Sequence, residues 1–248
     1  RVTDALKFAN EKMKETDLLK DEFLYTVTHE MRTPLTSIKA LSEILDDDDE
    51  MPEETKKEFL QTILKETNRM TRLISQVLDL ENFESGKHQL VIESVDLKAL
   101  IIDCVKSLDG VFQQEQIEVE LIIDETIPSL EIDYDRIVQV FLNILSNAAK
   151  YCEKGNGKVW ITATQTTDYV SIEIADNGPG VKEDMQQIIF EKFFQAKNQT
   201  MRKPKGSGLG LAISKKIIQL HEGKIGVTTR QPNGSIFTFS LPKQQNLH

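Results

Sequence analysis

The stretch LYTVTHEMRTPL, from Leu24 to Leu35, places a single histidine inside a helical pattern. At about 100° per residue, six side chains share one helix face: Leu24, Val27, Thr28, Met31, Leu35 and, just beyond, Ile38. His29 falls roughly 160° from Met31, so we expect its imidazole to face water. Glu30 can orient that ring, and Pro34 weakens the helix just beyond it at a cost of about 3 kcal/mol. The pattern indicates a nucleophile that another module must reach, although an ordinary surface histidine would fit it as well.

Two long helices are predicted around this stretch. The helix that carries His29 should end near Leu45, and residues 1–20, which lack Gly and Pro, predict an incoming helix. The acidic run Asp46–Pro52 indicates a turn. Residues 53–84 repeat apolar side chains at helical spacing, namely Phe59, Ile63, Met70, Ile74 and Val77. Two helices bury too little apolar surface to be stable alone, so we expect a homodimer that closes a four-helix bundle.

The composition is that of a polar globular protein. The 248 residues carry a net charge of -10, which argues against a nucleic-acid-binding surface. Cys104 and Cys152 match no metal spacing and indicate reduced thiols, which favours a cytoplasmic location. No apolar run approaches the roughly 20 residues that cross a bilayer, so no membrane contact is expected within this stretch. The chain opens on Arg1, which indicates a fragment and leaves an upstream membrane anchor open.

The hydrophobic period changes after a break in composition between Ser85 and Ser94. Helices are predicted from Asp96, as N-cap, to about Phe112, from Asp133 to about Tyr151, and from Gly208 to His221. Strands are predicted at Ile117–Ile123, around Val159–Ala163 and Val170–Ile174, and as a last hairpin at Ile225–Thr229 and Ser235–Leu241. This order predicts an α+β domain with its helices on one face of a mixed sheet.

The segment NILSNAAKY carries polar side chains on one helical face. Asn143, Asn147 and the pair Lys150/Tyr151 follow one another at helical spacing. Amide oxygens are neutral, hard ligands that suit Mg²⁺ bound to phosphates, and Lys150 can answer phosphate charge. This stripe is hard to explain as core, so it indicates a binding surface.

Two glycine-rich segments follow. In ADNGPGV, Ala175–Val181, Gly178 and Gly180 allow close backbone approach, and Asp176 at the end of a strand can accept a hydrogen bond from an exocyclic amine; a plain turn is the alternative. In KGSGLGLAIS, Lys205–Ser214, three alternating glycines open a helix whose free N–H groups can receive phosphate. The basic stretch between them fits a flap over a polyphosphate, or a surface loop.

In this order the segments resemble those of the sensor histidine kinases of two-component signalling. HEMRTPL is similar to their phospho-acceptor box, and NILSNAAKY, DNGPGV, FEKFF and GSGLGL are similar to the N, G1, F and G2 boxes of their ATP-binding domain. The resemblance runs from about residue 18 to the end of the chain. It implies a dimeric helical hairpin followed by the α+β two-layer sandwich of the gyrase, chaperone and histidine kinase ATPases.

The resemblance also implies roles for individual residues. His29 would be phosphorylated, Glu30 would be its acid–base partner, and Thr33 would position water with Glu30. Asn147 would ligate Mg²⁺ and Asp176 would bind the adenine amine of ATP. The remaining residues expected around the nucleotide are Asn143, Lys150, Tyr151, Gly178, Gly180, Ile189, Lys197, Gly206, Gly208, Leu209 and Gly210.

We therefore expect four regions: an incoming signalling helix (1–20), a dimerisation and phosphotransfer hairpin (21–85), a linker (86–95) and a catalytic ATP-binding domain (96–244). The expected activity is ATP-dependent autophosphorylation of His29, then transfer to an aspartate on the receiver domain of a response regulator. Regulator phosphatase activity is left open beside it. The alternatives are an ATPase or ATP-gated clamp of the same nucleotide fold, and a non-catalytic nucleotide-binding dimer scaffold.

Two positions depart from the family pattern. Many relatives carry Arg after the F-box aromatic residue, whereas this chain has Gln195, which cannot stabilise charge on the γ-phosphoryl group as a guanidinium would. Lys197 or Arg202 would then have to substitute, or turnover would be slow. Cys152 replaces the more usual Thr or Ser, with little expected effect. The handedness of the turn at 46–52, which decides between phosphorylation within and between subunits, is not readable from the sequence.

Overall fold

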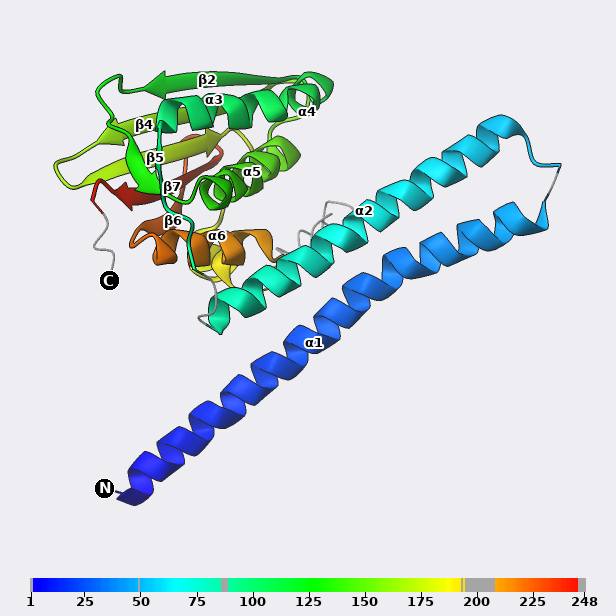
Figure 1. Cartoon of the computed structure of the whole chain (residues 1–248), viewed down its shortest axis with the longest axis horizontal. Coiled ribbons are helices and arrows are strands. Elements are labelled where there is room, and N and C mark those ends of the chain that lie inside the picture. Colours follow the sequence, from blue (N-terminus) through cyan, green and yellow to red (C-terminus); the bar gives the residue numbers. More distant parts are fainter. Residues whose placement is uncertain (1, 49, 86–88, 193, 195–207, 245–248) are drawn as a thin grey trace. The chain divides into compact units, whose positions relative to one another are not determined.

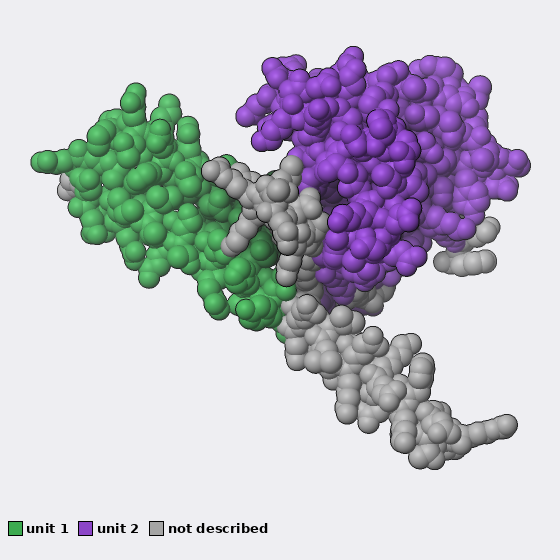
Figure 2. Space-filling view, turned by 180° about the vertical axis from the view of Figure 1, so that it is seen from behind, with its two compact units in different colours: residues 1–79 green, residues 80–248 purple. Residues whose placement is uncertain are grey.

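The computed structural model of the chain describes residues 2–48, 50–85, 89–192, 194 and 208–244; within residues 2–23 and at Glu84 it describes the backbone alone. The chain divides into two compact units, residues 1–79 and residues 80–248, which Figure 2 shows in green and purple. Each unit has its own architecture.

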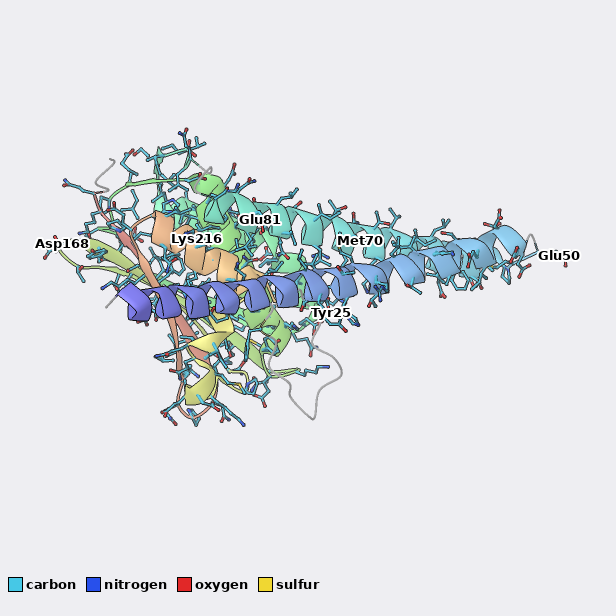
Figure 3. The ribbon with its side chains drawn as sticks, turned by 90° about the horizontal axis from the view of Figure 1, so that it is seen from below. Tyr25, Glu50, Met70, Glu81, Asp168 and Lys216 are labelled. Atoms are coloured by element: carbon cyan, nitrogen blue, oxygen red, sulfur yellow. The ribbon has the colours of Figure 1, made fainter. Side chains whose placement is uncertain are left out.

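The first unit is a helical hairpin. Helix α1 spans Val2–Asp47 and helix α2 begins at Glu53 and ends at Glu84, with its last turns in the second unit. Glu50 lies in the turn between the helices, and Tyr25 and Met70 lie on α1 and α2 (Figure 3). The predicted bounds of α2 are confirmed, and α1 runs two residues beyond the predicted end at Leu45.

The apolar face of α1 is only partly covered. Val27, Met31 and Ile38 are half-buried and Pro34 is buried, whereas Leu24 and Leu35 are 51% and 54% exposed. The predicted face of six residues is therefore split, because one partner helix covers an arc narrower than the whole stripe. On α2 a second apolar row is exposed in the same way, at Leu60, Leu64, Ile74 and Leu78.

The second unit is built on a mixed five-stranded sheet in the order β2-β4-β5-β7-β6. The strands are β2 (Ile117–Ile123), β4 (Gly157–Gln165), β5 (Tyr169–Asp176), β6 (Lys224–Thr229) and β7 (Ser235–Pro242). Strand β2 pairs with β4 in parallel, and the other neighbours are antiparallel. The mixed sheet predicted from the sequence is confirmed.

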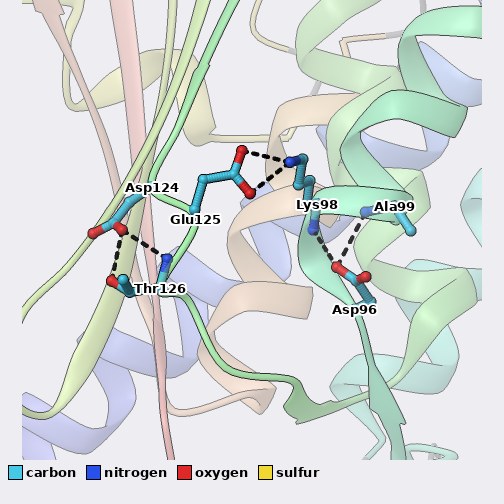
Figure 4. A network of polar contacts seen from close by, with 6 residues as sticks. All are labelled: Asp96, Lys98, Ala99, Asp124, Glu125 and Thr126. Carbon is cyan, nitrogen blue, oxygen red and sulfur yellow. Dashed lines mark hydrogen bonds and ion pairs between the residues drawn. The ribbon is translucent and has the colours of Figure 1, made fainter.

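Helices cover one face of this sheet (Figure 1). They are α3 (Leu97–Ser107), α4 (Asp109–Gln114), α5 (Tyr134–Tyr151) and α6 (Gly210–Leu220), with the short 3-10 helices η1 (Glu183–Met185) and η2 (Ile188–Phe190) before α6. Asp96 caps α3 as predicted, because its carboxylate accepts from the amides of Lys98 and Ala99 (Figure 4). Lys98 also pairs with Glu125, at 2.6 Å, on the loop after β2.

The core lies between the helices and the sheet. Seven side chains of α5 are buried, among them Phe141, whose ring meets Phe239 of β7 edge-on at a centroid distance of 5.2 Å. Burying such a side chain stabilises a fold by about 1.5–3 kcal/mol. The last turns of α2 join this unit: Phe83 is 2% exposed, and the Arg136 guanidinium lies 5.2 Å from its ring centroid.

The structure corrects three expectations. The helix predicted from Asp96 to Phe112 breaks at Leu108, where the Ser107 hydroxyl donates to the carbonyl of Cys104 and competes with the helical hydrogen bonds. The last helix begins at Gly210 rather than Gly208, because Gly208 has a φ of 71°. A small sheet of β1 (Glu93–Val95) and β3 (Leu130–Ile132) was not predicted from the sequence, since three residues are too short to show a period.

Candidate functional site

His29 is exposed on α1, as the sequence predicted. Its carbonyl accepts a 3.3 Å hydrogen bond from the hydroxyl of Thr33, one turn further on, which is also exposed. Pro34 cannot donate to the carbonyl of Glu30, so the backbone is loosened directly beneath the histidine. The imidazole makes no hydrogen bond to any side chain in the part of the chain that the structure describes. The ring is therefore open to an incoming group.

Glu30 points to the second helix of the hairpin. Its Oε2 accepts a 3.0 Å hydrogen bond from Nη2 of Arg69 on α2, and Nη1 of Arg69 lies 3.7 Å from Glu66. Adjacent residues on a helix do not face each other. His29 is therefore exposed, whereas the side chain of Glu30 is mostly covered and only 21% exposed. Arg69 was not singled out from the sequence, because it lies 39 residues from Glu30 and has no local signal.

Helix α5 positions the four polar residues of the NILSNAAKY segment. The side-chain nitrogen Nδ2 of Asn143 donates to the carbonyl of Gly210, at 3.1 Å, and to the hydroxyl of Ser214, at 3.3 Å. These hydrogen bonds connect α5 to the first turn of α6. One turn further on, Asn147 is half-buried, and its side chain has no hydrogen bond to any residue within the described ranges. At the end of the helix, the Lys150 ammonium lies 4.7 Å from the centroid of the Tyr151 ring.

Asp176 is a buried carboxylate at the end of β5. Its Oδ1 accepts from the amides of Gly178, at 2.8 Å, and Ser235, at 3.3 Å. The side chain of Ser235 also donates to this carboxylate, and Asp176 is only 3% exposed. Burial raises the pKa of this carboxyl group above its ordinary value, and the amide hydrogen bonds only partly offset this. An ionised carboxylate offers about four acceptor sites, so this group can accept a further hydrogen bond from a ligand.

Glycines keep the backbone close around Asp176. A side chain at Gly178 would collide with the carbonyl of Tyr151, and one at Gly180 would lie 2.7 Å from the carbonyl oxygen of Gly234. Gly180 also has a φ of 78°, which other residues rarely adopt. The sequence identified Gly234 only as part of a turn, yet a side chain there would collide with the carbonyl of Asp176. Gly234 and Ser235 were not assigned to the site from the sequence. The segment PNG, residues 232–234, indicates only the turn of a hairpin.

The start of α6 faces the same region of the domain. No side chain caps the helix at Leu209, so the N–H groups of its first turn are not satisfied by a side-chain cap. A side chain at Gly210 would lie 3.3 Å from the amide of Asn143. Uncapped N–H groups and the helix dipole favour an anion at this end, and the glycine lets α5 approach closely.

Not every residue predicted for the site lies open to it. Ile189 on η2 is 9% exposed and Leu209 is fully buried, so both support the site from the core. Lys197, Gly206 and the flap around them lie outside the described residues, as does Gln195. The structure thus brings together Asn143 with Gly210 and Ser214, and Asp176 with Gly178, Tyr151 and Ser235; α5 connects the two groups.

The acidic, histidine and cysteine side chains of the described residues do not gather into a metal centre. Within the described ranges, no group of three or more His, Cys, Asp or Glu side chains could hold a metal ion. Both cysteines are buried, and burial raises the pKa of Cys104 to about 12, so this thiol is unreactive. In the same part of the chain, no helix is long and apolar enough to pass through a bilayer.

The fold and the site define a nucleotide-binding domain joined to a helical hairpin, and the comparisons with known families agree. Residues 132–245 match the family of histidine kinase-, DNA gyrase B- and HSP90-like ATPases, and residues 19–86 match the His Kinase A (phospho-acceptor) domain. The chain belongs to the sensor histidine kinase family.

Individual relatives extend this result. Drug sensory protein A of Synechocystis sp. is 34% identical over 245 residues, which cover 94% of this chain and 36% of that protein. Full-length ShkA in complex with AMPPNP has a TM-score of 0.68 and 26% identity, covering 90% of this chain and 46% of that one. The histidine kinase ThkA in complex with the response regulator protein TrrA has a TM-score of 0.71 and 29% identity, covering 96% and 66%. The chain spans about a third or less of the length of curated relatives such as the first.

Proposed function

We propose that this chain is the core of a protein-histidine kinase, which transfers a phosphoryl group from ATP to His29 and then to an aspartate of a response regulator. The observation that carries the proposal is the exposed imidazole of His29 on a hairpin, in one chain with a domain that buries the carboxylate of Asp176 among close-packed glycines. Neither feature would stabilise a purely structural protein. The proposal rests also on the two matched families.

The residues around Asp176 fit an adenine base. The carboxylate of Asp176 would accept from the exocyclic amine at a remaining acceptor site, while Oδ1 keeps its two amide donors. The close packing at Gly178 and Gly234 holds the carboxylate in place, because any side chain there would displace the backbone. In the related kinase ShkA the bound ligand is AMPPNP, an ATP analogue. ATP supplies the phosphoryl group and the leaving ADP.

The polar face of α5 fits the phosphates and a magnesium ion. Asn147 presents an amide oxygen that is half-buried and has no hydrogen bond to the described residues, and Mg²⁺ prefers such oxygen ligands. Asn147 would hold the ion, which would screen the phosphate charges. Lys150 and the first-turn amides of α6, near Gly208 and Gly210, would bind phosphate oxygens directly.

His29 would act as the nucleophile. The neutral form of an imidazole ring leaves a nitrogen lone pair free. Nε2 attacks the γ-phosphorus, so that an N–P bond forms while the bond from that phosphorus to the bridging oxygen breaks, and the oxygen leaves with ADP. Glu30 would accept a hydrogen bond from Nδ1–H and offset the positive charge that grows on the ring.

The phosphorylated histidine would then donate to a receiver domain. An aspartate carboxylate attacks the phosphorus and His29 leaves as neutral imidazole after Nε2 regains its lone pair. The structure of ThkA with the regulator TrrA supports a partner of this kind. Thr33, one turn from His29, would position water with Glu30 when the phosphorylated regulator is dephosphorylated by hydrolysis. We further propose a homodimer, because the hairpin exposes apolar rows on both helices, and a cytoplasmic location, where ATP is available.

Labelling with ATP tests the proposal. Wild-type chain incubated with γ-labelled ATP and Mg²⁺ should acquire label that acid releases and alkali does not, as expected for an N–P bond. His29→Ala should lose this label and retain nucleotide binding measured by calorimetry, because the nucleotide residues lie in the other unit.

The outcome separates the proposal from its rivals. Unchanged labelling of His29→Ala would refute phosphorylation at this residue. Steady ATP hydrolysis without label would favour the ATP-gated clamp. Binding without turnover would favour the nucleotide-binding scaffold.

A further inference from the structure

A contact between Glu30 and Arg69 joins α1, at the residue after His29, to the middle of α2. Glu30 Oε2 lies 3.0 Å from Nη2 of Arg69, and the two side chains are 21% and 34% exposed. Arg69 is held from the other side by Glu66, on its own helix, at 3.7 Å. The guanidinium therefore lies between two carboxylates and has a fixed direction towards α1.

This contact decides which way Glu30 points. Charge-assisted hydrogen bonds are stronger than neutral ones, and part of this pair is shielded from water. A carboxylate in this position faces α2, whereas His29 faces solvent, and no hydrogen bond joins the two among the described residues. To accept from Nδ1–H of the imidazole, the Glu30 side chain must turn away from Arg69.

We propose that Arg69 is a positioning residue that restrains Glu30 on α2 and thereby slows phosphorylation of His29. The inference rests on the proposed function, because it assigns Glu30 to the imidazole during the transfer. Release of Glu30 becomes a step that precedes the transfer, and any movement of α2 that draws Arg69 aside speeds the reaction. Arg69 touches neither nucleotide nor His29 in this account, and acts through Glu30 alone.

The chain offers a matched control on the same helix. Arg72 lies three residues beyond Arg69, and its Nε donates to the carbonyl of Asn68 in its own helix, at 3.4 Å. It is exposed and makes no hydrogen bond or ion pair with α1 within the described residues. Removing the charge of Arg72 therefore changes the charge of α2 by the same amount without touching Glu30.

The test is the initial rate of label incorporation at saturating ATP, together with the KM for ATP. We expect Arg69→Gln to raise the maximal rate about two- to five-fold, the range set by partly exposed ion pairs, with KM unchanged. Arg69→Lys should remain near the wild-type rate, because an ammonium can still pair with the carboxylate. Arg72→Gln should match the wild type.

A second background excludes a merely structural effect. In Glu30→Gln, which keeps the length of the side chain but loses the charge, Arg69→Gln should no longer raise the rate. An equal rise in that background would mean that loosening of the hairpin causes it, and would overturn the inference. An unchanged or lower rate in Arg69→Gln alone, with helix content by circular dichroism as in the wild type, would overturn it too. Absence of label in the wild-type chain would instead refute the proposed function.

Discussion

Helix α2 and helix α5 have similar amphipathic patterns but differ in what covers them. On α5 seven apolar side chains are buried, and five of them are 0% exposed: Ile137, Val140, Phe141, Ile144 and Leu145. On α2, Leu60, Leu64, Ile74 and Leu78 are between 42% and 61% exposed. The sheet completes the core around α5 within one chain, whereas the hairpin has only α1. The difference shows that the second unit completes its hydrophobic core within one chain, whereas the first unit leaves an apolar face exposed.

The largest expected effect is a cavity in the closed core. Phe141→Ala removes a ring that packs on Phe239, and we expect it to lower the free energy of unfolding by about 3–5 kcal/mol. Trp160 is the single tryptophan of the chain and lies on β4, so its fluorescence in a urea titration reports on this unit.

Leu64→Ala is the matched change on the hairpin, where the side chain is 61% exposed. It should leave the midpoint of the urea transition followed by Trp160 fluorescence unchanged. It should lower the fraction of dimer measured by analytical ultracentrifugation. If it destabilises the Trp160 transition as much as Phe141→Ala, the contrast between the two units is wrong.

The next effect concerns the buried carboxylate. Asp176→Asn can keep the two amide donors on its oxygen, but its NH₂ group would meet the adenine amine donor to donor. Loss of a charge-assisted hydrogen bond of about 1.5–3 kcal/mol predicts roughly ten- to hundred-fold weaker ATP binding by calorimetry. Because burial raises the pKa of Asp176, the ionised group destabilises the empty domain at pH 7, and the variant should be at least as stable as the wild type.

Asp168→Asn is the control for this change, since Asp168 is exposed in the turn between β4 and β5. It should alter neither binding nor stability. A binding constant for Asp176→Asn equal to that of the wild type would remove this residue from the site.

A smaller effect depends on pH. The amide of Asp133 donates to Nε2 of His221 at 3.0 Å, and Nδ1 lies 2.8 Å from the carbonyl of Ile217, so the buried ring is neutral with its proton on Nδ1. Burial lowers the pKa of His221 below its ordinary 6.5. The unfolded chain therefore binds the proton first, and stability that is present above pH 6.5 is lost as the pH falls below it.

The expected slope is at most about 1.4 kcal/mol per pH unit. Urea titrations of the Trp160 signal between pH 7.5 and 5 measure it. In His221→Gln the slope in this range should be shallower, because glutamine does not titrate. Equal slopes in the two proteins would show that another group carries the dependence.

The smallest effect is expected at the surface. Lys98 and Glu125 lie 2.6 Å apart but their side chains are 43% and 75% exposed. Lys98→Met should change the free energy of unfolding by less than about 1 kcal/mol, and 1 M salt should reduce that difference further. A larger loss, insensitive to salt, would mean that the loop after β2 is part of the cooperative core.

Features with a local signal were predictable from the sequence. The bounds of α2, the N-cap at Asp96 and strand β2 follow from periodicity and capping preferences within a few residues. The exposure of His29 followed from its angle to Met31 on the same helix. The glycines at 178 and 180 were assigned to close approach, and their packing against Tyr151 and Gly234 is of that kind.

Features that join distant segments were not predictable. Ser235 meets Asp176 across 59 residues, and Asp133 meets His221 across 88. Arg69 meets Glu30 across the hairpin, in a register that the turn at 48–52 sets and no residue pattern reveals. The domain limits and the individual roles of the site residues remain predictions.

The uninterrupted course of α1 has a consequence for the histidine. From Val2 to His29 the helix contains no proline, and Pro34 comes only after the histidine. A rotation of the helix near residue 2 would therefore be transmitted to His29 without passing the helix weakened at Pro34. Each residue inserted near position 12 would turn the helical phase of everything before it by about 100° relative to His29, while seven would nearly restore it. The rate of His29 phosphorylation should then rise and fall with insertion length with a period of about 3.6 residues, one helical turn.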